Sequence, residues 1–471
     1  MAATSLYTRE AWWYVTVSLL EFLKIRNYMN QPTITIIGAG LAGAEAAWQA
    51  QKCGAHVRLV EMKPKKYTPA HKSEGFAELV CSNSLRSDST ANAVGLLKAE
   101  MRALGSLVME AADATCVPAG SALAVDREKF SAYITEKLRS CENIEIIEEE
   151  AERVEESDGA TVVATGPLTS EKMARFIEEE LGLSGLHFFD AAAPIVDAAS
   201  INMDTAFFAS RYDKGDADYI NCPMNAEQYE AFWQALITAE EAELHDFDRK
   251  EQKDLKVFEG CMPVEVMARR GRDTLLFGPL KPVGLVDPRV GKASHAVVQL
   301  RKENREGTMY NLVGFQTHLT FPEQRRVFRM IPGLENAEFL RYGVMHRNTY
   351  LNSPEYLAEN YRMKDRKIWF AGQMTGVEGY VESAGSGLLA GLSAARAALG
   401  KEEVVFPRTT MLGAMSYYVA NGGVGAFTPM NANFGIVEPL PYRVKGGKAA
   451  KNEELSKRAL AEIELILEKL R

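Results

Sequence analysis

Residues 33–43 read TITIIGAGLAG, and this stretch decides the fold of the first domain. The run TITII is β-branched and apolar, which is typical of a strand buried in a parallel sheet. The six residues after it match G-x-G-x-x-G at Gly38, Gly40 and Gly43. In this motif the first glycine permits a tight turn, the second lets the backbone approach a pyrophosphate, and the third allows a helix to pack closely on a strand. A helical stretch follows and closes at Gly54, so a βαβ unit is predicted.

The second strand of this unit is predicted from His56 to Val60, and it ends at Glu61. Glu61 lies 21 residues after Gly40 (61 − 40), where an acidic side chain can accept hydrogen bonds from ribose hydroxyls. The N-terminus of the intervening helix offers unpaired N–H groups and a positive dipole end to a phosphate. The expected dinucleotide contacts are therefore Gly38, Ala39, Gly40, Leu41, Ala42, Gly43 and Glu61.

Two later stretches favour FAD over NAD as the dinucleotide. A predicted strand ends in ATG at 164–166, and a late strand, KIWF, runs into AGQ at 371–373. Both features are typical of two-part flavin-binding domains, and the sequence predicts a second helix start at 385–387 that faces the flavin. A second G-x-G-x-x-G is missing, and Cys81 is followed by SNSLR rather than by the C-x-x-x-x-C spacing of disulfide reductases. The further cofactor contacts expected here are Gly166, Gly372 and Gln373.

The composition is that of an ordinary globular protein, with 46% hydrophobic and 25% charged residues among 471. The formal net charge of −9 gives no overall attraction for nucleic acid. Basic clusters occur at 269–272, 325–329 and 443–451, and each is better explained by solvated surface charge. The six cysteines show no C-x-x-C spacing. We therefore expect neither a zinc site of the usual kind nor a secreted disulfide framework, and a cytoplasmic location fits best.

Residues 1–28 are interpreted as a non-native or disordered extension. Their apolar run at 11–23 is shorter than the roughly 20 residues that a membrane-spanning helix needs, and Glu21 interrupts it. No signal-peptide cleavage site follows, and MNQPTITIIGAG, from Met29, reads as the expected start. The alternative is an amphipathic appendage that touches a membrane, although no stable membrane association is expected.

The rest of the chain predicts an α/β fold, namely a Rossmann-like, two-segment FAD-binding domain with an inserted α+β domain. Between about Asn202 and Pro332 the alternation of strands and helices fades into short strands, turns and one helix near 228–239. The predicted parts are a first FAD-binding segment at 29–201, an inserted substrate-contacting domain at 202–332, and a second FAD-binding segment with a C-terminal helix at 333–471.

Long stretches of the chain resemble one protein family. They include TPAHKSEGFAELVCSNSLRS at 68–87, FEGCMPVEVMARRG at 258–271 and FAGQMTGVEGYVESAGSGLLAG at 370–391. On these motifs, which are long and specific, the chain is similar to the folate- and FAD-dependent tRNA (uracil-5-)-methyltransferase family, TrmFO. The resemblance runs from about Met29 to Glu438.

The resemblance implies that C5 of a uridine in the tRNA T loop is methylated. It implies 5,10-methylenetetrahydrofolate as the carbon donor and FAD, reduced by NAD(P)H, as carrier and reductant. Uracil C5 is a poor nucleophile until a thiolate adds at C6, so an activated cysteine is needed. By resemblance Cys261 is this nucleophile, and the arginines of 269–272 favour a thiolate and an RNA backbone nearby. Cys81 matches a second family cysteine near the flavin, as general base or in control of the flavin adduct.

The expected partners are tRNA and folate, and no metal is expected. Three other functions stay open: a related flavoprotein that modifies another RNA uridine, in the wobble position or in rRNA, an NAD(P)H-linked flavin oxidoreductase without RNA, and a flavin-bearing RNA-binding module. The missing nicotinamide domain argues against the second, and the two cysteines in motifs argue against the third. Weaker site candidates, each equally well explained as structural, are His71, Lys281, Tyr342, His346 and Tyr380.

Overall fold

The strand TITII lies in the middle of a five-stranded parallel sheet, in the order β16-β7-β1-β2-β6. Its strands are β1 (Thr33–Ile37), β2 (His56–Glu61), β6 (Ile144–Glu148), β7 (Ala160–Val163) and β16 (Ile368–Phe370). β16 belongs to the second expected segment and pairs with β7 of the first. Both segments therefore build one sheet, as the sequence predicts.

The structure is a computed structural model. It describes residues 32–68, 70–154, 159–183, 185–191, 193–213, 216–242, 262–304, 307–343, 345–422 and 427–470. Residues 1–28 and Cys261 lie outside these ranges. No helix within the ranges is both long enough and apolar enough to cross a membrane.

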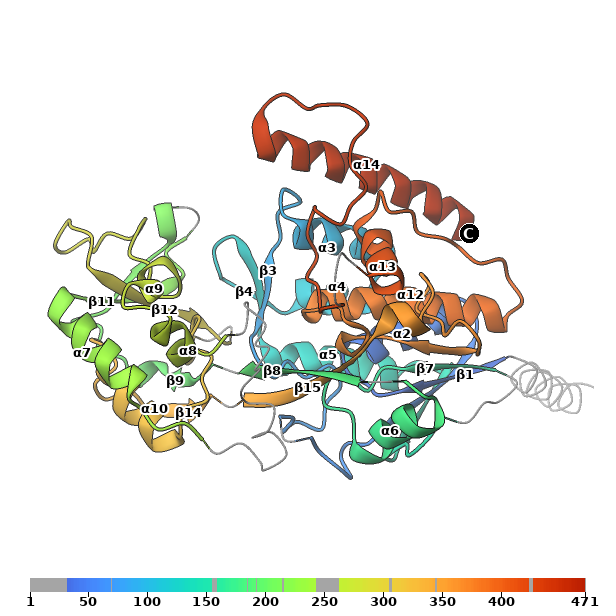
Figure 1. Cartoon of the computed structure of the whole chain (residues 1–471), viewed down its shortest axis with the longest axis horizontal. Coiled ribbons are helices and arrows are strands. Elements are labelled where there is room, and N and C mark those ends of the chain that lie inside the picture. Colours follow the sequence, from blue (N-terminus) through green and yellow to red (C-terminus); the bar gives the residue numbers. More distant parts are fainter. Residues whose placement is uncertain are drawn as a thin grey trace, which may run out of the picture.

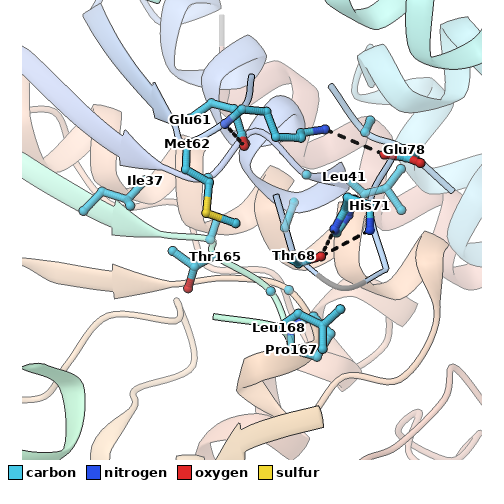
Figure 2. A pocket seen from close by; sticks show the side chains of 18 of the residues that line it. Ile37, Leu41, Glu61, Met62, Thr68, His71, Glu78, Thr165, Pro167 and Leu168 are labelled. Atoms are coloured by element: carbon cyan, nitrogen blue, oxygen red, sulfur yellow. Dashed lines mark hydrogen bonds and ion pairs between the residues drawn. The ribbon is translucent and has the colours of Figure 1, made fainter. Parts of the chain in front are cut away.

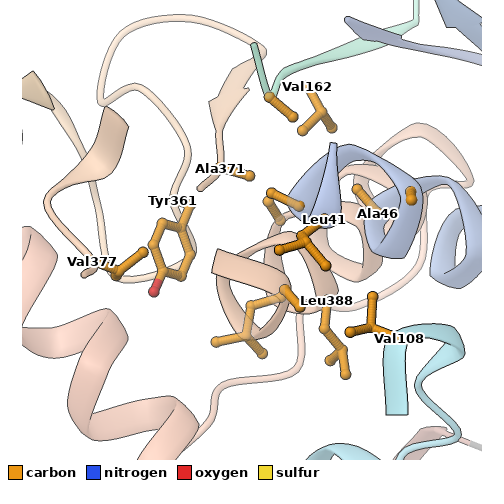
Figure 3. Close-up of a cluster of buried hydrophobic side chains, with 14 of the residues drawn as sticks. Leu41, Ala46, Val108, Val162, Tyr361, Ala371, Val377 and Leu388 are labelled. Atoms are coloured by element: carbon orange, nitrogen blue, oxygen red, sulfur yellow. The ribbon is translucent and has the colours of Figure 1, made fainter. Parts of the chain in front are cut away.

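Two helices, α2 (Leu41–Lys52) and α12 (Tyr380–Ala398), cover this sheet with their backbones in close approach (Figures 1 and 3). A Cβ at Gly387 would lie 2.1 Å from the Ala42 carbonyl oxygen, and one at Gly391 would lie 2.4 Å from that of Ala46. The expected helix start at 385–387 is wrong, because α12 begins at Tyr380. The glycines there serve helix packing rather than helix initiation.

Further helices pack near α2 and α12, and the buried side chains of two glutamates connect some of them. Glu100 accepts the Met411 and Leu412 N–H groups, which begin α13, at 2.7 and 2.9 Å. Glu45 accepts the Val108 N–H of α4 at 2.9 Å. Besides α2 and α12, the helices of this domain are α3 (Ala93–Ala103), α4 (Leu107–Ala114), α5 (Arg127–Arg139), α6 (Glu171–Arg175), α11 (Ser353–Tyr356), α13 (Met411–Asn421) and α14 (Gly447–Leu470). Short helical turns are η1 (Phe176–Glu180), η2 (Ala198–Ser200), η3 (Arg211–Asp213) and η7 (Gln373–Thr375).

The inserted α+β domain has its own sheet and core, and lies to the left in Figure 1. The strand order is β10-β11-β12-β13-β9-β14, and all its pairs are antiparallel. Its strands are β9 (Ile195–Asp197), β10 (Phe207–Ala209), β11 (Tyr219–Met224), β12 (Ala296–Lys302), β13 (Met309–Leu312) and β14 (Phe339–Arg341). Its helices are α7 (Ala226–Ile237), α8 (Val264–Arg269), α9 (Thr274–Phe277) and α10 (Phe321–Phe328). The sheet thus takes strands from both sides of the range 202–332.

Two smaller sheets lie between these domains in Figure 1. One pairs β8 (Gly185–Ala191) with β15 (Met345–Leu351) in antiparallel register. The other has the order β3-β5-β4, with β3 (Ser84–Ser87), β4 (Cys116–Val117) and β5 (Ala122–Val125). β3 begins three residues after Cys81, so the Cys81 segment lies at the boundary of the two domains.

Candidate active site

The turn between β1 and α2 is held by close backbone contacts. Gly38 has a φ of +97° and donates its N–H to the Val60 carbonyl at 2.7 Å. A Cβ at Gly38 would lie 2.6 Å from the Ala164 carbonyl oxygen, and one at Gly43 would lie 1.7 Å from that of Gly38. Only glycine fits at these two positions, which pack the turn against its neighbouring strands.

Gly40 is different, because its missing side chain leaves open space. It is the N-cap residue of α2, with φ −69° and ψ −171°, and as a glycine it has no side chain that could make a capping hydrogen bond. A Cβ at this position would meet no described atom within 4 Å. The first N–H groups of α2 and the positive end of its dipole therefore face a space that suits a phosphate.

Glu61 is held rigidly at the end of β2. It is 6% exposed, and its carboxylate accepts the Ala39 N–H at 2.7 Å and the Lys63 N–H at 3.0 Å. Each carboxylate oxygen can accept more than one hydrogen bond. Glu61 can therefore fix the loop 38–43, called here the phosphate loop after the ligand expected at it, and still accept a hydrogen bond from a sugar hydroxyl.

A pocket of about 1090 Å³, counting its open mouth, lies in front of this loop (Figure 2). Among the expected contacts, Ala39 and Gly43 do not line it: Ala39 donates to Glu61, and Gly43 packs on Gly38. The expected contacts that do line it are Gly38, Gly40, Leu41, Ala42, Glu61, Gly166, Gly372 and Gln373. The ends of β1, β2, β7 and β16 thus meet at one pocket, because the carboxyl ends of parallel strands lie on one sheet edge.

Gly166 and Gly372 follow neighbouring strands and both have positive φ, +73° and +87°. The Gly372 N–H donates to Ser386 Oγ of α12 at 2.7 Å. Gln373 opens the turn η7, and its side-chain amide donates to Glu378 at 3.3 Å. α12 therefore fixes the second glycine turn against the pocket.

The loop 62–78 supplies lining residues that sequence reasoning did not single out, such as Met62, Lys63 and Thr68. His71 also lines the pocket, and its Nδ1 lies 2.5 Å from Thr68 Oγ1 (Figure 2). Burial, and then the charge of Lys63, lower the pKa of His71, so its imidazole is neutral near neutral pH. The polar composition of this loop was the available signal, but it does not show which side chains point inward.

Cys81 lies beside the pocket, and its neighbour Val80 lines it. The Cys81 N–H donates to the phenolic oxygen of Tyr380, a pocket residue at the start of α12, at 2.6 Å. Burial raises the pKa of Tyr380, so the phenol is neutral. Cys261 lies outside the described residues. Of the weaker candidates, Tyr342 stacks on Phe321 in the inserted domain with ring centroids 4.7 Å apart.

Comparisons with known proteins match most of the chain. A family model described as glucose inhibited division protein A matches residues 33–402. The methylenetetrahydrofolate--tRNA-(uracil-5-)-methyltransferase TrmFO of Acetivibrio thermocellus is 61% identical over 428 residues, which are 91% of this chain and 97% of that protein. The protein of the same name from Lactobacillus johnsonii is 58% identical over 92% of this chain and 98% of its own.

The chain belongs to the TrmFO family. The range matched by the family model contains the phosphate loop, Cys81 and Gly372. Among solved structures, GidA of Aquifex aeolicus superimposes with a TM-score of 0.65 at 19% identity, over 94% of this chain and 75% of that one. A second crystal form of that protein gives a TM-score of 0.66. At this identity the likeness shows a shared fold, which agrees with a two-segment Rossmann-like domain carrying an insertion.

The described residues of this TrmFO-family chain include neither a metal-ligand cluster nor a disulfide. Within the described ranges, no group of three His, Cys, Asp or Glu side chains is placed to hold a metal ion. The cysteines that the structure describes are all unbridged: Cys53, Cys81, Cys116, Cys141 and Cys222. Burial raises the pKa of Cys222 to about 12, so this thiol is a small core side chain rather than a nucleophile.

Proposed function

We propose that this protein methylates C5 of a uridine in the T loop of tRNA. The carbon comes from 5,10-methylenetetrahydrofolate, and FAD with NAD(P)H provides the reducing power. The observation that carries the proposal is the 61% identity, over 91% of the chain, with a protein named for methylenetetrahydrofolate-dependent tRNA (uracil-5-)-methylation. Sites that act on substrate are expected to be kept at this level of similarity.

The pocket residues fit FAD. A pyrophosphate needs a backbone without a side chain at a helix N-terminus, and the open space at Gly40 offers this arrangement. A ribose needs an acceptor at the end of the second strand, where Glu61 lies. Bound FAD would supply the reducing equivalents that convert a methylene unit into a methyl group. Gly166, Gly372 and Gln373 would contact the rest of the cofactor from the neighbouring strand ends.

In this proposal the two motif cysteines have separate roles. Cys261 adds to C6 of the target uracil, and the electron pair moves to C5, which then attacks the carbon donor. Loss of the C5 proton releases the donor nitrogen from the methylene carbon. A hydride equivalent from the reductant then converts this methylene into a methyl group as the Cys261 thiolate leaves C6 and the C5–C6 double bond is restored. Cys81 acts at the flavin pocket as a base or in control of the flavin, which its position next to Val80 favours. The segment 202–332 is proposed to contact RNA.

Nucleoside analysis tests the reaction and its position. Purified protein would be incubated with unmodified tRNA transcript, NADPH and labelled methylenetetrahydrofolate. Label in 5-methyluridine is expected, and a transcript whose T-loop target uridine is replaced by cytidine should take up none. Label in the altered transcript would favour another RNA uridine, the second candidate function. Absence of label from every RNA would contradict the proposal.

Covalent trapping tests the nucleophile separately. A T-arm RNA that contains 5-fluorouridine should become attached to the wild-type protein, because fluorine at C5 prevents the release step. Cys261→Ala should abolish the adduct, whereas Cys116→Ala, which removes an exposed thiol, should keep it. An adduct with the Cys261 variant would place the nucleophile elsewhere, with Cys81 the next candidate.

The proposal also includes a cytoplasmic location and independence from metal ions. A cytoplasmic location agrees with a tRNA substrate and with the unbridged cysteines of the described residues. Activity without added metal is expected, and it should survive incubation with a chelator. A loss of activity on chelation that zinc or magnesium restores would contradict independence from metal ions.

A further inference from the structure

The loop 79–83, called here the Cys81 loop, is the wall between two pockets. Val80 faces the dinucleotide pocket, and Leu79 faces a second pocket of about 1310 Å³, counting its open mouth. The second pocket has walls from both domains: Arg127 comes from the FAD-binding domain, and Arg341 comes from the inserted domain. The Cys81 loop therefore lies where the two domains meet.

Arg127 holds this loop from the side of the FAD-binding domain. Its guanidinium donates to the Leu79 carbonyl at 2.8 Å and to the Cys81 carbonyl at 3.3 Å. It also forms an ion pair with Glu303 of the inserted domain, with Nε and Oε2 2.6 Å apart. Glu303 is 2% exposed, so this ion pair is buried in the boundary between the domains.

Two arginines of the inserted domain hold the same loop from the other side. Arg301, on β12, donates to Ser82 Oγ at 2.7 Å and to Asn83 Oδ1 at 3.1 Å. Arg341, at the end of β14, donates to the Val80 carbonyl. Consecutive residues of the loop are thus bound by guanidinium groups from three separate elements.

The charges around Cys81 do not balance. Three guanidinium groups face the loop, and Glu303 is the carboxylate that pairs with them. Of the other acidic residues that line the second pocket, Glu78 pairs with Lys63 and accepts the Lys72 and Ser73 N–H groups, Asp126 pairs with Lys129, and Glu128 lies in the first turn of α5. The phenols of Tyr380 on α12 and Tyr219 on β11 also interact with the arginines, and burial raises the pKa of each. A phenol with a raised pKa is neutral, so the cluster keeps an excess of positive charge near the sulfur.

The electrostatic effects agree with this excess. Burial lowers the pKa of Arg301, and burial and then the charge of Arg127 lower that of Arg341. Burial also acts to lower the pKa of Arg127, but its interactions with Glu303 and its other partners together outweigh burial, and that pKa is raised. A negative charge on Cys81 raises the pKa of all three arginines. Because such coupling is mutual, the same arginines favour the ionised form of the sulfur.

We propose that Arg301 and Arg341 are positioning residues for Cys81: together with Arg127 they fix the Cys81 loop and hold its sulfur as a thiolate. The chemical state of a residue in the FAD-binding domain is then set by the inserted domain, the part proposed to contact RNA. This inference rests on the proposed function for the use of Cys81, but the ionisation itself can be measured without methylation.

The test is the pH profile of Cys81 alkylation in the full-length protein. Iodoacetamide would be added across a pH series, and labelling of the Cys81 peptide would be followed by mass spectrometry. Arg301→Met and Arg341→Met should each raise the pH of half-maximal labelling by about one unit, because each removes a nearby positive charge. Lysine at either position should restore much of the wild-type profile, since it restores the charge without the planar fork.

A matched control is Arg326→Met, also in the inserted domain, where Arg326 forms an exposed ion pair with Glu323. This variant should leave the Cys81 profile unchanged, and the exposed Cys116 gives an internal reference in every sample. Melting temperature and flavin absorbance identify variants that do not fold. If a methionine variant does not fold, the lysine variant at the same position is compared with the wild type instead.

A wild-type Cys81 profile in Arg301→Met and Arg341→Met would overturn the inference. An equal shift in Arg326→Met would also overturn it, because the effect would then be general. If the alkylation profiles shift as expected but no RNA is methylated, the inference stands and the proposed function fails.

Discussion

Cys81 and Tyr380 are 299 positions apart in the sequence, and the Cys81 N–H donates a 2.6 Å hydrogen bond to the Tyr380 phenolic oxygen. Tyr380 is the first residue of α12, the helix that also holds the Gly372 turn through Ser386. The second FAD-binding segment therefore positions both the late glycine turn and the Cys81 loop. Two parts of the proposed site therefore depend on the first two turns of α12.

Tyr380→Phe removes the acceptor of the Cys81 N–H while keeping the ring. An unpaired amide group costs about 1–3 kcal/mol when it is buried. We expect a small loss of stability, retained flavin and methylation that is slower by about tenfold or more. The measurement is the rate of single-turnover methylation, with flavin content as the control. Unchanged methylation would mean that this hydrogen bond does not position Cys81.

Two glycines of the phosphate loop should respond oppositely to substitution. Gly40→Val places a side chain in open space, so the protein should fold with little loss of stability but lose its flavin absorbance. Gly43→Ala places a Cβ 1.7 Å from the Gly38 carbonyl oxygen, so it should lower the melting temperature strongly. Flavin of wild-type intensity in Gly40→Val would contradict the placement of the pyrophosphate.

Removing either partner of the ion pair between Arg86 and Glu382 should lower the free energy of unfolding, but by different amounts. Glu382 is fully buried and also accepts the Ala432 N–H at 2.9 Å, whereas the Arg86 side chain is 40% exposed. Arg86→Met leaves a buried carboxylate without its counter-charge and should cost about 3–5 kcal/mol. Glu382→Gln leaves an arginine that water can solvate and should cost about 1–2 kcal/mol.

Denaturant unfolding of both single variants and of the double variant measures this asymmetry. The double variant should lose less than Arg86→Met, because no unpaired buried charge remains. A larger loss in Glu382→Gln than in Arg86→Met would contradict the assignment of the cost to the buried carboxylate.

Glu100 should make stability depend on pH. Burial raises its pKa to about 8 in the folded protein, so between about pH 5 and pH 8 the folded state binds a proton that the unfolded state has released. This contribution is complete below the ordinary carboxyl pKa and is lost as the pH rises towards 8, by about 1.4 kcal/mol per unit. Glu100→Gln mimics the protonated acid and has no such dependence.

The measurement for Glu100 is urea unfolding of the wild type and of Glu100→Gln across this pH range. The wild-type free energy of unfolding, relative to that of the variant, should fall as the pH rises. Parallel curves for the two proteins would show that Glu100 does not titrate in the folded state over this range. Other titrating groups cancel in the difference.

The sequence alone determined where the phosphate loop lies and to which family the protein belongs. β1, Gly38, Gly43 and Glu61 follow from local rules, because a strand, a glycine turn and a helix within about thirty residues have little choice of arrangement. The helix start predicted at 385–387 was wrong because local rules do not explain glycines inside a helix. Glycines in a helix weaken it locally, and only the close approach to Ala42 explains Gly387 in the middle of α12.

The tertiary structure decided which side chains surround Cys81. Tyr380, Arg301 and Arg341 come from segments that are more than 200 residues away from it along the chain. Nothing in their local sequence specifies a partner, since strands β12 and β14 would have the same pattern facing any buried surface. Their positions follow from the packing of the inserted domain against the FAD-binding domain, where buried guanidinium groups must find acceptors and take the carbonyls of the Cys81 loop.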